Sequence, residues 1–237
     1  MPSSVQGRVR STTPSFLRSV RSPLIRTAFA AAVFLAMAAV VRSRTGSTSF
    51  DRWLSNDFVA DDSTLTFKIA RVLTELGSPV VVILLALFGA GILWGRRRQF
   101  VTAIAVVAAP GFAGIAETVL KGVVGRPRPA TAVLAGEAGN GFPSGHAAGF
   151  AALAFVIALL VVQRRYRIAG IVVAILLSVV IAITRVLVGA HYPTDVLAGL
   201  LLGFSVADVT ALAANLLVKR SLGGFNPVSR ARENRPF

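Results

Sequence analysis

Six long apolar segments, separated by short polar or basic stretches, constrain this chain more than any other feature of its sequence. At the helical rise of about 1.5 Å per residue, each segment can cross a hydrocarbon layer roughly 30 Å thick, the shorter ones with help from flanking residues. We therefore predict an all-α, integral membrane bundle of six helices. The predicted spans are 24–41, 76–95, 100–120, 147–162, 168–183 and 196–218.

Composition supports a membrane protein and excludes several other classes. The apolar share is 54% and the mean hydropathy is +0.72, both typical of membrane proteins. The net charge of +15 would suggest nucleic-acid binding in a soluble protein, but here the basic residues cluster between apolar segments. No nucleic-acid partner is therefore expected. The absence of cysteine excludes disulfides, thiol chemistry and cysteine-based zinc sites.

The basic clusters predict how the chain is oriented. If the six spans alternate, the clusters at the N-terminus, at 96–98, at 164–167 and at the C-terminus all fall on one side. Loops rich in Lys and Arg stay in the cytoplasm. We therefore expect a multi-pass plasma-membrane protein with both termini cytoplasmic. The acid-bearing loop 42–72 and the loops after the third and fifth spans then lie on the non-cytoplasmic face.

Domain organisation is expected to be simple. One six-span domain covers 24–218, and the basic, Ser- and Pro-containing segments 1–23 and 219–237 are expected to be disordered cytoplasmic tails. Each basic residue near an anionic lipid surface contributes about 1 kcal/mol to binding, so such a surface is an expected partner. A cleaved signal peptide is the alternative for the first apolar segment. The long basic lead and the five further spans favour an uncleaved span.

The loop 42–72 carries an apolar stripe. Phe50, Trp53, Leu54 and Phe58 recur at helical spacing, and acidic residues lie opposite them. This pattern predicts a short amphipathic helix lying in the membrane interface. An ordinary packing stripe on a loop helix would give the same pattern.

Four cations lie at the non-cytoplasmic ends of the third and fifth spans or in the loop after the third. They are Lys121, Arg126, Arg128 and Arg185. Charged groups at such positions cost free energy unless an anion or an acid pairs with them. The planar fork of Arg matches phosphate oxygens, and Lys supplies a compact point charge. Snorkelling to the interface is the alternative, and for Arg126 alone it is equally plausible.

The sequence Pro143-Ser144-Gly145-His146 directly precedes the fourth span. Ser144 is a natural N-cap, and Gly145 allows a ligand to approach the backbone closely. A helix N-terminus with free amide donors binds anions. A plain helix start is the alternative, but it leaves His146 unexplained.

His191 and Asp195 lie four residues apart at the start of the sixth span. Residues at this spacing share a helix face, so Asp195 can orient the imidazole and fix its tautomer. A carboxylate behind an imidazole is typical of an activated nucleophile or base, although a capping contact would have the same spacing. Two imidazoles, several cations and a helix N-terminus fit phosphoryl transfer better than acyl transfer.

These residues resemble the type 2 phosphatidic acid phosphatase superfamily, the membrane-bound lipid phosphate phosphatases. The family pattern is Lys, six residues, Arg-Pro; then Pro-Ser-Gly-His; then Ser-Arg, five residues, His, three residues, Asp. Lys121 and Arg128 match the first part, and the second part matches completely. The third part matches except that Thr184 stands where Ser is usual, which keeps the hydroxyl group.

The resemblance implies a phosphatase acting on a lipid phosphate or a polyprenyl diphosphate such as undecaprenyl diphosphate of the cell envelope, with its active site on the non-cytoplasmic face. His191 would form a phosphohistidine, Asp195 would support it, and His146 would protonate the leaving oxygen. No metal or other cofactor is expected. The residues expected to bind the phosphoryl oxygens are Lys121, Arg128, Ser144, Gly145 and Arg185.

Two alternatives remain open on the sequence. A lipid phosphotransferase would use the same phosphohistidine with an alcohol as acceptor. A six-span anion transporter is the other, and Asp208 in the middle of the last span supports it. Transporters bind near the midplane, however, whereas these cations lie at one rim. Two smaller predictions are that Gly199 and Gly203 allow close helix packing and that Glu117 pairs with Lys121.

Overall fold

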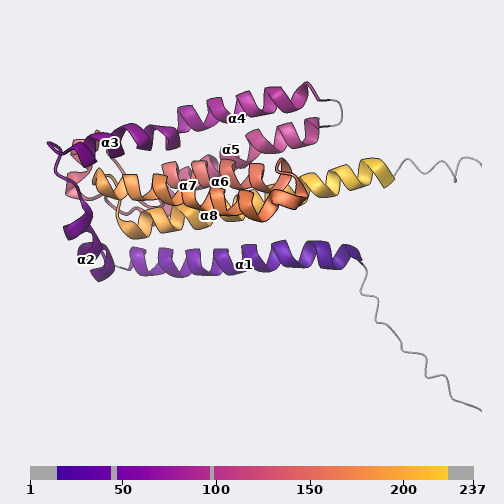
Figure 1. Cartoon of the computed structure of the whole chain (residues 1–237). Coiled ribbons are helices and arrows are strands. Elements are labelled where there is room, and N and C mark those ends of the chain that lie inside the picture. The colour runs from indigo at the N-terminus through magenta and orange to yellow at the C-terminus, as the bar shows by residue number, and fades with distance from the viewer. Residues whose placement is uncertain (1–14, 44–46, 97–98, 224–237) are drawn as a thin grey trace, which may run out of the picture.

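The computed structural model describes residues 15–43, 47–96 and 99–223, and within these ranges it is helical, with no strand (Figure 1). The helices are α1 (Ser15–Arg42), α2 (Ser49–Phe58), α3 (Leu65–Thr74), α4 (Pro79–Trp94), α5 (Phe100–Val124), α6 (Gly145–Leu160), α7 (Arg167–Leu187) and α8 (Pro193–Gly223). Three 3-10 turns connect them: η1 (Glu75–Gly77), η2 (Ala130–Ala135) and η3 (Arg164–Tyr166). The predicted all-α class is confirmed.

The long helices run side by side, with α6 and α8 inside the bundle and α1 and α4 on its outer sides (Figure 1). The short helices α2 and α3 lie together at one end. Thr48, Thr64 and Ser78 each accept a backbone N–H with their side chain, at the starts of α2, α3 and α4. These caps determine where the chain turns at that end.

Small residues allow α6 and α8 to approach closely. A Cβ on Gly199 would lie 2.5 Å from the carbonyl oxygen of Ser144, and one on Gly203 would lie 2.5 Å from that of Ala148. The facing surface of α6 is buried and rich in alanine, including Ala151 and Ala152. The predicted packing role of both glycines is confirmed.

Several of these helices are suited to cross a membrane. Among the described residues, four helical segments are long and apolar enough: Ser22–Arg42, Phe100–Val124, Arg164–Leu187 and Pro193–Ser221. The pair Leu65–Gly77 and Pro79–Trp94, bent by 49°, makes a fifth if it counts as one span. Helix α6 is apolar but shorter, with 16 residues. The protein is a membrane protein, and six crossings stay a prediction.

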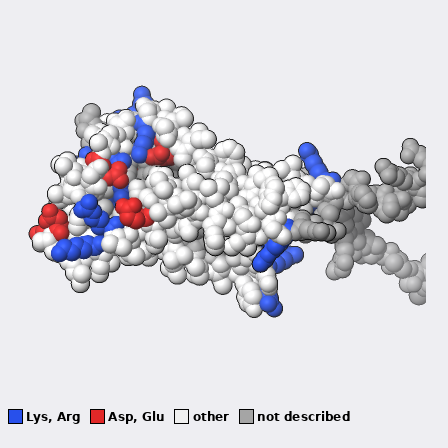
Figure 2. All heavy atoms as spheres, turned by 90° about the horizontal axis from the view of Figure 1, so that it is seen from above, with Lys and Arg blue, Asp and Glu red and all other residues white. Residues whose placement is uncertain are grey.

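Charged side chains collect at the two ends of the molecule, with a largely uncharged middle between them (Figure 2). Acidic and basic residues mix at the end that holds α2 and α3. Many large apolar side chains are exposed along the sides, for example Phe29, Phe88 and Ile168. Such an apolar belt suits contact with lipid.

Some boundaries differ from those predicted. Helix α1 begins at Ser15 and α8 ends at Gly223, so both reach into segments predicted to be disordered tails. The rest of those tails, 1–14 and 224–237, lies outside the described residues. The loop 42–72 contains the predicted amphipathic helix as α2, on which Phe50 and Trp53 are exposed. It also contains α3, which the apolar stripe did not predict.

The acid within the last span has a partner. Arg26 of α1 donates to Asp208 through Nε, at 3.2 Å from Oδ2, and through Nη2, at 2.8 Å from Oδ1. A paired carboxylate inside a helical bundle is a structural feature rather than a transport site. The observation that best supported a transporter therefore has a simpler explanation.

Candidate active site

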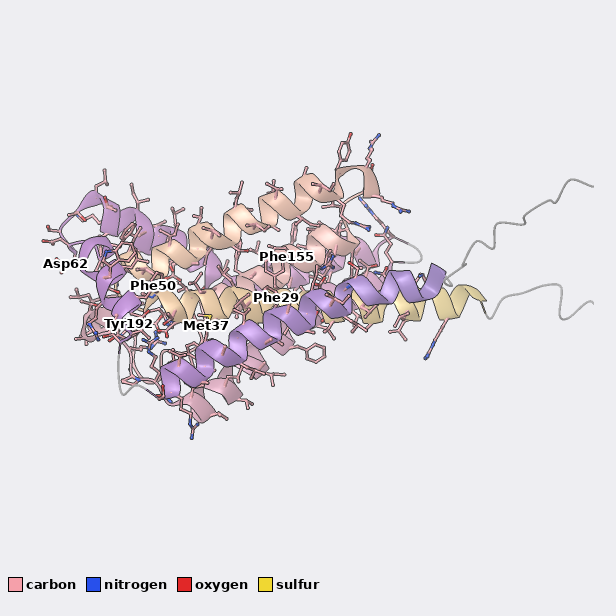
Figure 3. The ribbon with its side chains drawn as sticks, turned by 90° about the horizontal axis from the view of Figure 1, so that it is seen from below. Phe29, Met37, Phe50, Asp62, Phe155 and Tyr192 are labelled. Atoms are coloured by element: carbon pink, nitrogen blue, oxygen red, sulfur yellow. The ribbon has the colours of Figure 1, made fainter. Side chains whose placement is uncertain are left out.

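The three motif segments meet at the end of the bundle that holds α2 and α3. Figure 3 shows Tyr192, the neighbour of His191, at the same end as Phe50 and Asp62, far from Phe29. Two backbone hydrogen bonds join the segments: Ser144 N–H donates to the Asp195 carbonyl at 3.0 Å, and Gly141 N–H donates to the Arg126 carbonyl at 2.8 Å. One site thus contains residues from across the sequence.

His191 is buried, with 2% of its surface exposed, and a charged residue lies at each ring nitrogen. Nη1 of Arg128 lies 3.0 Å from Nε2. A guanidinium has only donors, so this contact requires an unprotonated Nε2 and puts the ring proton on Nδ1. Nδ1 in turn faces Oδ2 of Asp195 at 3.6 Å, an electrostatic contact that is too long for a hydrogen bond.

Burial lowers the pKa of His191 to about 4, and the charges of Arg128 and Arg185 act in the same direction, against Asp195. A lowered pKa keeps the imidazole neutral at physiological pH. Its Nε2 therefore carries an unprotonated lone pair, which can attack an electrophile once the contact with Arg128 is released.

Asp195 is held more firmly than a simple capping contact would require. The side chain is fully buried; Oδ1 accepts from Nη1 of Arg126 at 2.5 Å, and Oδ2 accepts the backbone N–H of Tyr192 at 3.0 Å. These bonds fix the carboxylate behind the imidazole of His191.

Arg128 and Arg185 converge on a single anion, the carboxylate of Glu137 in the loop after η2. Nη2 of Arg128 lies 3.0 Å from Oε2, and Nη2 of Arg185 donates to Oε1. Although burial alone would raise the pKa of Glu137, the charges of Arg185 and Arg128 hold it below its ordinary value. Both guanidinium groups can thus bind one anion at the same time.

The segment Pro143–His146 forms the N-terminus of α6. Ser144 is the N-cap residue, but its side chain makes no capping hydrogen bond. Its buried hydroxyl has no hydrogen-bond partner within the part of the chain that the structure describes. His146, in the first turn, is partly buried and interacts electrostatically with His191, Arg185 and Glu137. The hydroxyl and the first amides of α6 are thus placed to bind an anion.

Lys121 is placed near this region by its pairing with an acidic residue. Its ammonium pairs with Glu117 one turn earlier on α5, which confirms the predicted pair. A Cβ on Gly145 would lie 2.8 Å from Oε1 of Glu117. Lys121 therefore lies beside the N-terminus of α6, while Arg128 and Arg185 meet at Glu137.

The structure adds Asp51 and Glu137 to the site, neither of which the sequence identified, and it settles the role of Arg126. Arg126 is 2% exposed and binds Asp51 as well as Asp195, which excludes snorkelling. Asp51 is fully buried, whereas the stripe on α2 had put it on the polar face. The spacing of Thr48 and Asp51 did indicate a capping box, which the structure contains. Glu137 had no comparable signal.

Thr184, the one departure from the family pattern, makes its side-chain hydrogen bond within its own helix. Its hydroxyl donates to the carbonyl of Ile181 at 2.7 Å. The neighbouring Arg185 donates instead to Thr74 of α3 at 3.2 Å and to Glu137. The Thr184 hydroxyl therefore supports α7 rather than the anion site.

An apolar groove of about 480 Å³ extends from the site between α4, α5 and α6. Glu117 and Gly145 line it where it meets the charged residues. Its other walls are formed mainly by Val82, Ile83, Gly111, Gly114, Ile115 and Gly149. The groove joins the charged end of the bundle to its apolar side.

Comparison with known proteins identifies the family. The model of the PAP2 superfamily matches residues 99–218, which include all three motif segments. The chain belongs to the PAP2 superfamily. A crystal structure of a PAP2-type phosphatidylglycerolphosphate phosphatase from Bacillus subtilis has the same fold, with a TM-score of 0.69 and 24% identity over 85% of this chain and 98% of that one.

Curated relatives of this PAP2 protein are phosphatases. A lipid A 1-phosphatase from Rhizobium johnstonii is 40% identical over 111 residues, 43% of each chain, so the match spans less than half the length of that relative. Phosphatidylglycerophosphatase B from Bacillus subtilis is 28% identical over 72% of this chain and 85% of its own. Decaprenylphosphoryl-5-phosphoribose phosphatase from Mycobacterium tuberculosis is 33% identical over 59% and 76%. These relatives do not favour a transporter or a phosphotransferase.

Proposed function

We propose that this PAP2 protein is a membrane phosphatase that hydrolyses a lipid phosphate or a polyprenyl diphosphate through a phosphohistidine. The observation that carries the proposal is the convergence of Arg128 and Arg185 on one anion, with Arg128 also 3.0 Å from Nε2 of His191. A phosphoryl group bound by both arginines would lie next to that nitrogen. Positioning and charge stabilisation are the main requirements of phosphoryl transfer.

In the first step, the substrate phosphoryl group takes the place of the Glu137 carboxylate between the two arginines. The Ser144 hydroxyl and the α6 amides, including that of Gly145, donate to its oxygens, and Lys121 adds charge. Arg128 moves its hydrogen bond from Nε2 of His191 to the phosphoryl group, and Nε2 then forms a bond to phosphorus while the bond to the leaving oxygen breaks. The ring then carries positive charge, which Asp195 stabilises from the Nδ1 side.

In the second step, water replaces the leaving group. His146 gives a proton to the leaving oxygen in the first step and takes one from the attacking water in the second. The bond between phosphorus and His191 breaks, inorganic phosphate leaves, and both histidines return to their starting states. We propose that no metal takes part, because the side-chain cations supply the charge stabilisation that a metal would otherwise provide.

The apolar groove supports a lipid substrate. It begins beside the N-terminus of α6 and is lined mostly by apolar residues, so an acyl or prenyl chain fits there while the phosphate binds the cations. We propose that lipid reaches the site sideways from the membrane. The names of the relatives span lipid A, phosphatidylglycerophosphate and a polyprenyl phosphoribose.

The proposed setting is the plasma membrane, with both termini cytoplasmic and a six-span domain over 24–218. The site then faces the non-cytoplasmic side. The charged residues visible at the opposite end are basic, which supports this orientation (Figure 2).

Release of phosphate by purified protein in detergent tests the function. Phosphatidic acid, phosphatidylglycerophosphate and undecaprenyl diphosphate are compared, with His191→Ala as the inactive control. Activity should persist in EDTA, and vanadate should inhibit as a five-coordinate phosphorus mimic. Loss of activity in EDTA with recovery on adding a divalent ion would refute the metal-free mechanism. Transfer of phosphate to an added alcohol in preference to water would identify a phosphotransferase.

A further inference from the structure

A buried cluster of three charges lies behind His191, on the side away from the phosphate-binding arginines. Arg126 is at its centre: Nη2 lies 2.5 Å from Oδ2 of Asp51, and Nη1 lies 2.5 Å from Oδ1 of Asp195. The side chains of these three residues are at most 1% exposed. Helix α2, the end of α5 and the start of α8 thus meet at one ionic contact.

Asp51 is held by a full set of hydrogen bonds. Its carboxylate accepts the backbone N–H and the hydroxyl of Thr48, at 3.0 and 2.8 Å, and the backbone N–H and hydroxyl of Thr194, at 3.0 and 2.8 Å. Although burial works the other way, these donors and Arg126 keep the pKa of Asp51 below its ordinary value. Asp51 is therefore ionised at neutral pH.

The sign of each charge shows what Asp51 does for the site. Asp195 faces His191 on one side and Arg126 on the other. With Arg126 alone behind it, Asp195 would form a neutral pair and exert little attraction on a positively charged imidazole. The negative charge of Asp51 balances Arg126, so the three groups together carry one net negative charge.

We propose that Asp51 is a positioning residue for the nucleophile: by binding and neutralising Arg126, it leaves the charge of Asp195 available to His191. All three motif segments lie in the second half of the sequence. Asp51, in the loop 42–72, supplies the negative charge that balances Arg126. The effect on the imidazole stands on geometry alone, and only its kinetic consequence rests on the proposed function.

Other charged groups around His191 do not cancel the effect of Asp51 on the protonation of the imidazole. Arg128 and Arg185 oppose protonation of the ring from the phosphate side, and Glu137 pairs with both. His146 also interacts electrostatically with it. The cluster behind Asp195 is therefore the main source of negative charge on the Nδ1 side.

The direct test measures the imidazole itself. The chain has only two histidines, so in a His146→Gln background a single ring remains for nitrogen-15 NMR in nanodiscs. Asp51→Asn should lower the pKa of His191 by about one unit, because one negative charge is lost nearby. An unchanged pKa would overturn the proposal whether or not the protein is a phosphatase.

Two further variants separate charge from packing. Thr194→Val removes a hydroxyl that binds Asp51 and Arg126 but no charge, so the pKa of His191 should stay as in the parent. Asp51→Asn combined with Arg126→Gln removes opposite charges together and leaves Asp195 negative. This double variant should regain the parental pKa. A double variant as shifted as Asp51→Asn would contradict the charge-balance argument.

Kinetics on the otherwise native protein complete the test. Asp51→Asn should lower kcat by roughly tenfold, the equivalent of one pKa unit, with little change in KM. The exposed Asp62→Asn at the same end is the matched control and should behave as the parent. Loss of kcat in Asp51→Asn without a shift in the pKa of His191 would make Asp51 merely structural and overturn the proposal.

Discussion

At the scale of single residues, the two histidines of the site differ in what surrounds them. His191 is buried between Arg128 and Asp195, with its unprotonated Nε2 facing Arg128. His146 is more accessible and belongs to the first turn of α6. The first environment suits a nucleophile, and the greater exposure of His146 gives it access to a leaving oxygen or to water.

Substrates with different leaving groups should separate the two histidines. His146→Ala should nearly stop hydrolysis of phosphatidic acid, because general acid catalysis contributes roughly 10²–10⁴-fold and an alkoxide needs the proton. It should keep measurable release from p-nitrophenyl phosphate, and phosphoenzyme should still be trapped. His191→Ala should fail on both substrates. Equal loss of both in folded His146→Ala would make His146 a binding or structural residue.

The lowered pKa of His191 predicts how activity depends on acid. In the proposed mechanism the neutral ring is the nucleophile, and burial lowers its pKa to about 4. Activity is therefore present above that pKa and is lost as pH falls through it. The acid limb of kcat/KM for p-nitrophenyl phosphate should have its midpoint near pH 4 rather than at the ordinary value of about 6.5. A midpoint above pH 6 would show that His191 is not the group that limits the rate.

Glu137 should compete with phosphate for the two arginines. Its carboxylate binds Arg128 and Arg185 in the unliganded protein and must leave when a phosphoryl group binds. Glu137→Gln keeps the shape but removes the charge, so inorganic phosphate should inhibit roughly tenfold more strongly, a difference of about 1.4 kcal/mol. The inhibition constant measures this. Weaker inhibition would mean that the carboxylate is needed to orient the arginines.

At the scale of elements, helix ends rather than helix interiors build the site. The C-terminal part of α5 carries Lys121, the N-terminus of α6 carries Ser144, the end of α7 carries Arg185, and α8 begins just after His191. The small residues between α6 and α8 hold these ends in register. The groove between α4, α5 and α6 reaches the same place from the apolar side.

Filling the groove should discriminate against long-chain substrates. A Cβ on Gly114 would have no atom within 4 Å, so a side chain at this position can begin to extend into the groove. Leu also has a higher helix propensity than Gly. Gly114→Leu should lower kcat/KM for a lipid phosphate by roughly tenfold and leave p-nitrophenyl phosphate unaffected. Gly91→Leu, on α4 with equally open space but away from this groove, is the matched control. An equal loss on both substrates would disprove a tail-binding groove.

At the scale of the whole molecule, the charge distribution divides the chain into two ends and an apolar belt (Figure 2). The site, α2 and α3 share one end, and both described chain termini of the bundle lie at the other (Figure 1). An ionic contact between Arg26 and Asp208 ties α1 to α8. The arrangement suits a protein that handles a lipid headgroup at one membrane face.

The predicted topology can be tested directly. Reporter fusions after residues 98, 135, 165 and 190 should alternate between cytoplasmic and external signals, because basic clusters stay inside. Positions 135 and 190 lie beside the site and should be external. A cytoplasmic signal at either of them would reverse the proposed orientation of the active site.

The sequence by itself was sufficient for the helical class, the apolar segments and the family. These properties depend on local patterns: hydrophobic length for the spans, and motif spacing for Lys121, Ser144 and His191. The spacing of His191 and Asp195 also predicted that they face each other, since one helical turn separates them. The pairing of Glu117 with Lys121 follows from the same periodicity.

Only the tertiary structure decided which distant charges meet. Asp51 binds Arg126, Glu137 bridges Arg128 and Arg185, and Asp208 is paired rather than free. No local pattern specifies such contacts, because partners far apart in sequence are brought together by how the helices pack. The apolar stripe on α2 predicted that Asp51 lies on the polar, exposed face of the helix. Periodicity identifies the apolar face of a helix, but it does not show that a distant cation binds and buries an acid on the other face. Helix packing, not any motif, connects the loop 42–72 to His191.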